Sequence, residues 1–324
     1  MKFYVWYHQP NMSQMSPQQW LQQNGANGTS LALPELLWYQ RYTKVLDLTP
    51  GMAIHSKLAG TYLAKSKGRG MEFDEVRHYQ NGDDVRTIDW RVTARTGKVH
   101  TKLFREEKER PVFILTDLGN SMRFGSNLLF KSVQAAHLAA VIAWHVKQRG
   151  DKLGGLVFSQ QQHIELKPQS RSNGVLRYFH ALTEVHQAQS GSRGLNLNEA
   201  LSQIRRLVRP GSMLYILSDF NDFDDNGLRH IRAIRQHNEV SCCAITDPLD
   251  LMLPDNSQGL AAISDGQDTR YIELGSAVLK QRYAQQQQAW QQQLKHHTSQ
   301  LGCKWLAVNA AEPVLSQLER KWYG

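Results

Sequence analysis

Residues 111–117 read PVFILTD, and residues 213–219 read MLYILSD. Both stretches are short and almost continuously apolar, and both end in an aspartate. Apolar strands separated by helices of ten or more residues are typical of a parallel sheet that is covered on both faces. We therefore predict a doubly wound, mainly parallel α/β sheet, in which Asp117 and Asp219 end two strands at the same edge.

The segments around these two strands continue the alternation of strands and helices. Further strands are predicted at 153–159, 163–167, 239–247 and 303–308, and a small hairpin at 260–273. Helices are predicted at 130–149, 172–189, 197–208, 226–238, 276–300 and 312–322. The apolar residues of the helix at 130–149 recur at helical spacing on one face.

The remainder of the chain differs in composition from this alternating part. Residues 1–32 are rich in Gln, Asn, Ser and Gly and read as a polar lead-in. Residues 33–110 read as an N-terminal extension, with a helix over 33–48, a charged block and a strand over 98–104. The predicted domains are therefore 1–32, 33–110 and an α/β domain over 111–324.

The bulk composition sets limits on location and partners. The 324 residues carry a net charge of +9, so an acidic partner would be attracted at long range. The three cysteines lack the spacing of a zinc site and are expected as free thiols in a reducing cytoplasm. The N-terminus lacks the features of a signal peptide, and no apolar run approaches the roughly 18 residues that span a bilayer. We expect a soluble, cytoplasmic protein.

The two strand-end aspartates indicate a site at the edge of the sheet. The layout resembles the von Willebrand factor A fold, whose metal-ion-dependent adhesion site begins with an Asp-x-Ser-x-Ser loop. A threonine from a later loop and an aspartate from a later strand complete that site. The resemblance implies metal candidates at Asp117, Ser121 and Asp219, whose hard oxygen atoms suit Mg²⁺.

The sequence departs from that pattern at two positions. Gly119 stands where the middle serine is expected, and Leu195 aligns with the threonine. Because a hard cation needs its full set of oxygens, we expect a degenerate site without tightly bound Mg²⁺. Arg193 is then a candidate to neutralise the remaining carboxylates. The alternative is structural, since an aspartate at a strand end often caps the next helix.

The charged block before residue 111 carries a second resemblance. Its pattern, GxGxEF followed later by GDDxRxIDWxxxAR and then FxEE, resembles the bacterial domain-of-unknown-function family numbered fifty-eight. The matching residues are Gly68, Gly70, Glu72, Phe73, Arg77, Tyr79, Gly82, Asp83, Asp84, Arg86, Ile88, Asp89, Trp90, Ala94, Arg95, Phe104, Glu106, Ser121, Met122, Phe124, Gly125 and Lys131. The resemblance covers roughly residues 35–250.

The acids and bases of the block are suited to bidentate pairing. Asp83, Asp84 and Asp89 could pair with Arg77, Arg86, Arg91 and Arg95. Two compatible interpretations stay open: an internal network that clamps the extension onto the α/β domain, and a surface for a partner. Trp90 offers a large apolar anchor. The residues predicted to bind a partner are Asp83, Asp84, Arg86, Asp89, Trp90, Arg95 and Arg193.

We predict a non-enzymatic interaction module, to which the family resemblance adds a partner. The resemblance implies an adaptor or chaperone-like partner of a MoxR-type AAA-plus ATPase that acts on a client protein. One alternative is a nucleic-acid-binding protein that uses the basic excess for phosphate contacts. Another is a metal-dependent nuclease that uses Asp89 with Glu106, Glu107 and Lys108, although this short pattern recurs by chance. No GxSxG, HExxH or phosphate-loop motif is present.

Overall fold

The computed structural model describes residues 17–42, 71–80, 82–106, 109–188, 191, 194–254, 259–264 and 269–323. The chain forms two compact units. One comprises residues 1–51 together with 110–324, and the other comprises residues 52–109. We call the first the sheet unit and the second the insert unit, and describe each by itself.

A six-stranded sheet organises the sheet unit, with the strand order β10-β7-β6-β3-β4-β5. The strands are β3 (Pro111–Asp117), β4 (Lys152–Phe158), β5 (His163–Ser170), β6 (Met213–Ser218), β7 (Glu239–Thr246) and β10 (Lys304–Asn309). All neighbours pair in parallel except β5, which runs antiparallel to β4. The predicted mainly parallel α/β sheet is confirmed.

The alternation of side chains along β3 explains why a nearly continuous apolar run forms this strand. Val112 and Ile114 face one hydrophobic core, whereas Phe113 and Leu115 face a second core on the opposite side. Successive strand residues point to opposite faces, so a sheet covered on both sides needs apolar residues at every position.

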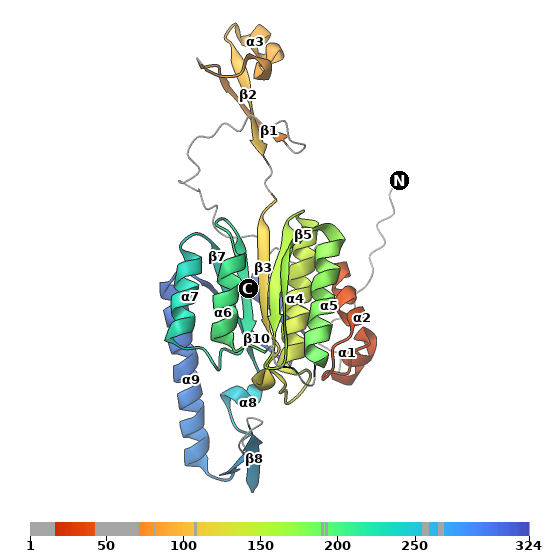
Figure 1. Cartoon of the computed structure of the whole chain (residues 1–324), viewed down its shortest axis with the longest axis vertical. Coiled ribbons are helices and arrows are strands. Elements are labelled where there is room, and N and C mark those ends of the chain that lie inside the picture. The colour runs from red at the N-terminus through yellow and green to blue at the C-terminus, as the bar shows by residue number, and fades with distance from the viewer. Residues whose placement is uncertain are drawn as a thin grey trace. The chain divides into compact units, whose positions relative to one another are not determined.

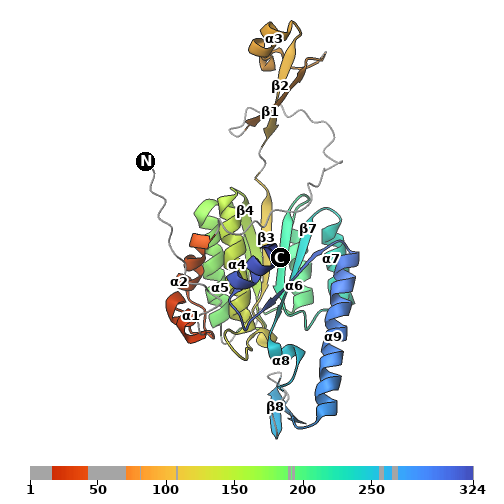
Figure 2. The same ribbon diagram turned by 180° about the vertical axis from the view of Figure 1, so that it is seen from behind.

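Helices cover both faces of the sheet (Figures 1 and 2). The core on one side includes residues of α4 (Lys131–Gln148), α5 (Arg171–Gln187) and α10 (Val314–Tyr323). The core on the other side includes residues of α6 (Leu197–Leu207), α7 (Asp225–Arg235) and α9 (Ala277–Gln300). In α4, 15 of 18 residues are buried, because other helices pack against the side that faces away from the sheet.

Two short elements connect β7 to α9. The single-turn helix α8 (Pro248–Leu251) directly follows β7, and the hairpin of β8 (Leu260–Ser264) and β9 (Thr269–Glu273) comes next. The hairpin predicted at 260–273 is therefore confirmed. The predicted strands and helices of residues 130–322 also match the structure to within a few residues.

The N-terminal boundary of the predicted extension needs correction. Residues 33–42 form α2 (Leu33–Trp38) and the 3₁₀ turn η2 (Tyr39–Tyr42), and they pack against α4 in the sheet unit. Trp144 Nε1 donates to the Leu36 carbonyl at 3.0 Å, and His137 Nε2 lies 3.2 Å from Glu35 Oε2. The sequence predicts a helix here, but it does not indicate which surface of the protein the apolar side of this helix packs against. Positions 43–48 of the predicted helix lie outside the described residues.

The predicted polar lead-in also contains structure that the sequence did not indicate. Helix α1 (Pro17–Asn24) belongs to the sheet unit, and Trp20 and Leu31 are buried in its core. The abundance of Gln and Asn in this segment conceals a few apolar residues that suffice to dock it.

The insert unit is built on an antiparallel hairpin. Strand β1 (Met71–His78) pairs with β2 (His100–Glu106), and the chain between them forms η3 (Val85–Thr87) and α3 (Trp90–Thr96). The strand predicted at 98–104 corresponds to β2. Its partner β1 was not predicted, because charged residues interrupt the apolar pattern there.

Candidate functional site

The candidate site lies where the chain reverses direction across the sheet. From the central strand β3 the chain proceeds to β4 and β5 on one side, and then to β6, β7 and β10 on the other. The carboxyl ends of β3 and β6 therefore form a topological switch point, where open α/β sheets bind ligands. Asp117 ends β3, and Asp219 directly follows β6.

The strand register brings the two aspartates together as predicted. Thr116 pairs with Leu217, so Asp117 lies beside Ser218 at the end of the ladder. The Ser218 hydroxyl donates to Asp117 Oδ2 at 2.6 Å, and the Gly119 amide donates to Oδ1 at 2.8 Å. Both oxygens of the buried Asp117 carboxyl group thus have partners from the chain itself.

Asp219 is neutralised by a lysine. The Lys131 Nζ atom, at the start of α4, lies 3.0 Å from Asp219 Oδ2, and the Lys131 side chain is only 2% exposed. The backbone and side-chain amides of Asn221 also donate to Asp219, each at 3.1 Å. Arg193 was predicted to have this neutralising role. At Asp219 that role belongs to Lys131, and Arg193 itself lies outside the described residues.

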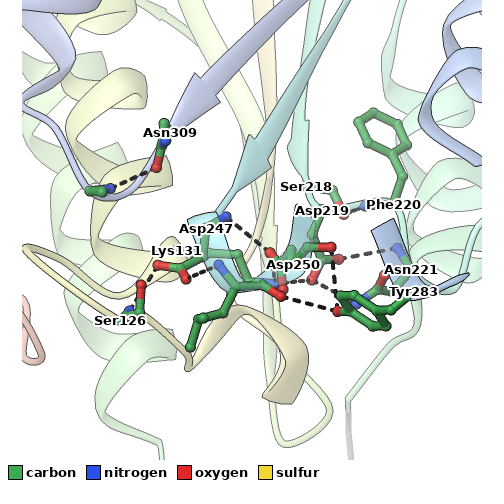
Figure 3. Close-up of polar contacts among 12 residues, drawn as sticks. Ser126, Lys131, Ser218, Asp219, Phe220, Asn221, Asp247, Asp250, Tyr283 and Asn309 are labelled. Carbon is green, nitrogen blue, oxygen red and sulfur yellow. Dashed lines mark hydrogen bonds and ion pairs between the residues drawn. The ribbon is translucent and has the colours of Figure 1, made fainter. Parts of the chain in front are cut away.

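A third strand-end aspartate extends this cluster, which Figure 3 shows. Asp247 follows β7, is fully buried, and accepts hydrogen bonds from the Ser126 and Leu249 amides at 2.8 and 2.9 Å. Asp250, on α8, lies 2.9 Å from Lys131 Nζ and accepts from the Asp247 amide at 3.0 Å. The Tyr283 hydroxyl of α9 donates to the Leu249 carbonyl at 3.1 Å. We call Lys131, Asp219, Asp247 and Asp250 the lysine cluster.

The residues at this edge do not fit the magnesium site of the von Willebrand factor A fold. Gly119 supplies no side-chain oxygen, and the Gln160 amide packs 2.8 Å from the position that a Cβ would take there. Leu195 is packed in the core between the sheet and α6, and its amide donates to the Ser159 carbonyl. Of the predicted metal ligands, Ser121 lies in the short η4 turn (Asn120–Met122) and still provides a hydroxyl group. The Lys131 ammonium next to Asp219 further disfavours a divalent cation.

Burial and a neighbouring acid shift the protonation of Asp117. Burial raises the pKa of Asp117 to about 7, and the nearby charge of Asp219 adds to this rise, while the Ser218 and Gly119 hydrogen bonds oppose it. Burial and the charge of Asp219 also raise the pKa of Asp222. A carboxyl group in this state is stabilised in its neutral form.

The sequence contained a signal for the residues that were missed. SCCAITD at 241–247 ends in an aspartate as PVFILTD and MLYILSD do, so Asp247 could have been placed at the same edge. Lys131 follows the apolar run Leu128–Phe130, where a charged residue indicates a buried partner. Its partner Asp250 could not be identified, because only the folded chain brings α8 to the start of α4.

In the insert unit, the predicted acids mainly hold their own backbone turns. Asp83 forms the one predicted carboxylate–arginine pair, with Arg77 Nη2 at 2.7 Å, and also accepts from the Gln80 amide. Asp84 caps η3 through the Arg86 amide. Asp89 caps α3 through the amides of residues 91 and 92, and lies 3.7 Å from Lys102 Nζ. Hydrogen bonds to the carboxylates, first from backbone amides, lower the pKa of Asp83 and of Asp89.

The remaining predicted partner residues of the insert unit lie at its surface. Trp90 is 69% exposed and Val85 is 62% exposed, and the side chains of Arg86 and Arg95 are exposed as well. Asp89 uses its carboxylate as a helix cap, which leaves it poorly placed as a metal ligand for a nuclease. The side chain of Glu106 and residues 107–108 lie outside the described part of the chain.

Comparison with known sequences assigns the family. The model of a family described as "Protein of unknown function DUF58" matches residues 75–294. The chain belongs to this family. Uncharacterized proteins of Mycobacterium bovis and Mycobacterium tuberculosis are each 32% identical over 212 residues, which is 65% of this chain and 66% of theirs. The chain thus spans 66% of the length of these relatives.

Two solved structures are similar to part of this chain. The conserved hypothetical protein BatB from Bacteroides thetaiotaomicron is 16% identical, with a TM-score of 0.41, over 65% of this chain and 98% of that protein. A von Willebrand factor type A protein from Catenulispora acidiphila is 13% identical, with a TM-score of 0.30, over 45% of this chain and 35% of that protein. Among the described helices, none combines the length and the apolar composition needed to cross a bilayer.

Proposed function

We propose that this protein is a non-enzymatic interaction module in the cytoplasm. In this role it is an adaptor that couples a MoxR-type AAA-plus ATPase to the remodelling or maturation of a client protein. Membership of the family supports the choice of ATPase, through the association that the sequence resemblance implies. The three buried free thiols agree with a reducing compartment.

The observation that carries the proposal is the chemistry of the switch point. This edge is where an α/β enzyme would hold its reacting groups. Here the oxygens of Asp117 and Asp219 are bonded to the chain's own amides, the Ser218 hydroxyl and the Lys131 ammonium. An edge closed in this way is suited to present a fixed surface. We propose that it works without tightly bound Mg²⁺.

The second support is the exposed surface of the insert unit. Trp90 stands at the first position of α3 and Val85 lies in η3, and both are more than half exposed. Tryptophan and arginine are enriched among the residues that dominate binding energy at protein interfaces. We assign the ATPase contact to this surface, which also includes Arg86 and Arg95.

A pull-down from native lysate with the full chain tests this assignment. Trp90→Ala should reduce recovery of the ATPase at least tenfold, since removal of such an anchor costs about 2 kcal/mol or more. Asp83→Ala and Asp84→Ala are less informative, because these carboxylates stabilise the turns of the insert unit.

The matched control is Val278→Ala in the sheet unit, where the side chain is 77% exposed. That variant should recover the ATPase as wild type does. Equal recovery by wild type and Trp90→Ala would contradict the surface assignment. Failure of wild type to recover any AAA-plus ATPase would contradict the adaptor function.

A separate observation favours nucleic-acid binding as the second candidate function. Five exposed arginines lie on the adjacent helices α6 and α7 or directly after them, and no carboxylate among the described residues pairs with them within 4.0 Å. They are Arg205, Arg206, Arg209, Arg229 and Arg232. Phosphate contacts of this kind lose affinity steeply with salt. Recovery of only RNA or DNA in the same pull-down, lost at high salt, would establish this alternative.

A further inference from the structure

The Lys131 ammonium lies between two carboxylates of different exposure. Nζ is 3.0 Å from Asp219 Oδ2 and 2.9 Å from Asp250 Oδ2. The Asp219 side chain is 5% exposed, whereas that of Asp250 is 31% exposed. Asp219 is therefore the inner ligand of the ammonium, and Asp250 covers it on the side that solvent reaches.

The backbone around Asp250 is held by contacts that do not need its carboxylate. Tyr283 holds the carbonyl groups of Leu249 and Asp250, and the buried Asp247 carboxylate holds the amides of Ser126 and Leu249. Rotation of the Asp250 side chain would thus uncover Nζ while α8 stays in place. The rotation would break the bond from the Asp247 amide and the contact with Lys131.

The ammonium keeps its charge in this environment. Burial lowers the pKa of Lys131, but the charges of Asp219 and Asp250 outweigh that effect, so that the pKa is raised overall. The Phe124 ring, 41% exposed and centred 6.0 Å from Nζ, lies next to the same ammonium. A buried cation with one ring face and one replaceable carboxylate beside it is suited to bind an acidic side chain.

We propose that Lys131 is a metal-independent anion site for an Asp or Glu side chain of a partner protein, and that Asp250 is its internal competitor. The inference rests on the proposed adaptor function. Two carboxylates already contact the ammonium at once, so a partner's carboxylate that replaces Asp250 leaves the number of carboxylates on the ammonium unchanged.

Fluorescence anisotropy with a labelled peptide of four alternating Glu and Asp residues, at low salt and with the full chain, tests the site. Asp250→Asn keeps an oxygen for the Asp247 amide but removes the competing charge. An internal ligand lowers apparent affinity by the fraction of sites that it leaves open. We expect Asp250→Asn to bind the peptide about tenfold more tightly than wild type does.

Glu165→Gln is the matched control, because it removes one negative charge at an exposed position of β5. It should bind as wild type does, and a peptide of alternating Gln and Asn should bind none of the variants. Adding Lys131→Met to Asp250→Asn should abolish the gain. Equal affinities of Asp250→Asn and Glu165→Gln would overturn the inference, whether or not the lysine variant folds. That result would leave recovery of the ATPase through Trp90 unaffected.

Discussion

At the scale of single residues, the edge of the sheet is governed by an imbalance between acids and cations. Asp117, Asp219 and Asp247 lie at the carboxyl ends of three neighbouring strands. Lys131 forms ion pairs with both Asp219 and Asp250. Asp117 has hydrogen-bond donors, but no cation among the described residues pairs with it, so its charged form is costly in the buried site. This explains why its pKa rises to about 7.

The raised pKa of Asp117 makes stability depend on pH. In the unfolded chain this carboxyl group ionises near pH 4, whereas in the folded protein it keeps its proton until about pH 7. The folded state therefore binds more protons in this window, and its contribution to stability is complete below about pH 4 and lost as pH rises to about 7. Asp117→Asn should remove this loss and be more stable than wild type at pH 8, by on the order of a few kcal/mol.

Urea unfolding of both proteins at pH 5 and pH 8 measures the effect. The difference between Asp117→Asn and wild type should grow with pH, and parallel behaviour would show that the raised pKa is wrong.

Magnesium provides a second comparison, since a bound divalent cation would keep Asp117 ionised. We expect millimolar Mg²⁺ to leave the wild-type pH dependence unchanged. A stabilisation by Mg²⁺ that Asp117→Asn abolishes would show that the site holds a metal.

At the scale of elements, the N-terminal helices complete the packing around α4. Glu35 and His137 are both almost fully buried and contact each other, and Trp144 holds the end of α2 by its indole N–H. Leu36 is fully buried in the same core. The segment that precedes the charged block is therefore part of the sheet unit, although more than 80 residues separate Tyr42 from Lys131 at the start of α4.

Truncation of Leu36 tests this docking. Leu36→Ala should destabilise the protein by about 2–5 kcal/mol, which is the range for large-to-small changes in a packed core. Val278→Ala removes methyl groups from a side chain that is 77% exposed and should change stability by less than about 0.5 kcal/mol. Guanidinium unfolding followed by circular dichroism measures both. Equal, small effects would show that residues 33–42 are a loose extension.

At the scale of the whole molecule, the chain divides its tasks between two units. The sheet unit contains both hydrophobic cores and the lysine cluster, whereas the insert unit carries the exposed Trp90. Within the insert unit, Asp83, Asp84 and Asp89 hold the turns through contacts to residues of the same unit.

Replacement of residues 52–109 by a flexible Gly-Ser linker tests this division. The shortened protein should keep the near-ultraviolet circular dichroism of a packed sheet unit and its peptide binding in the Asp250→Asn background. It should lose recovery of the AAA-plus ATPase. A shortened chain that fails to fold would show that the sheet unit depends on the insert unit.

The mainly parallel sheet and the place of the candidate site could be predicted from the sequence. Continuous apolar runs that end in aspartate are typical of buried parallel strands, and in such a sheet the ends of neighbouring strands bring Asp117 and Asp219 to one edge. Gly119 and Leu195 also indicated the departure from the magnesium pattern, because neither supplies a side-chain oxygen. The charged block was sufficient to indicate the family.

Only the folded chain shows that Lys131 pairs with Asp219 and Asp250, and where the N-terminal segment packs. Lys131 and Asp250 are 119 positions apart, and a charge pair at that separation leaves no periodic pattern in the sequence. The docking of Leu36 on α4 likewise depends on the shape of a surface that six strands and several helices build together. Local patterns record which residues must be buried, but only the packed chain fixes which partner each of them meets.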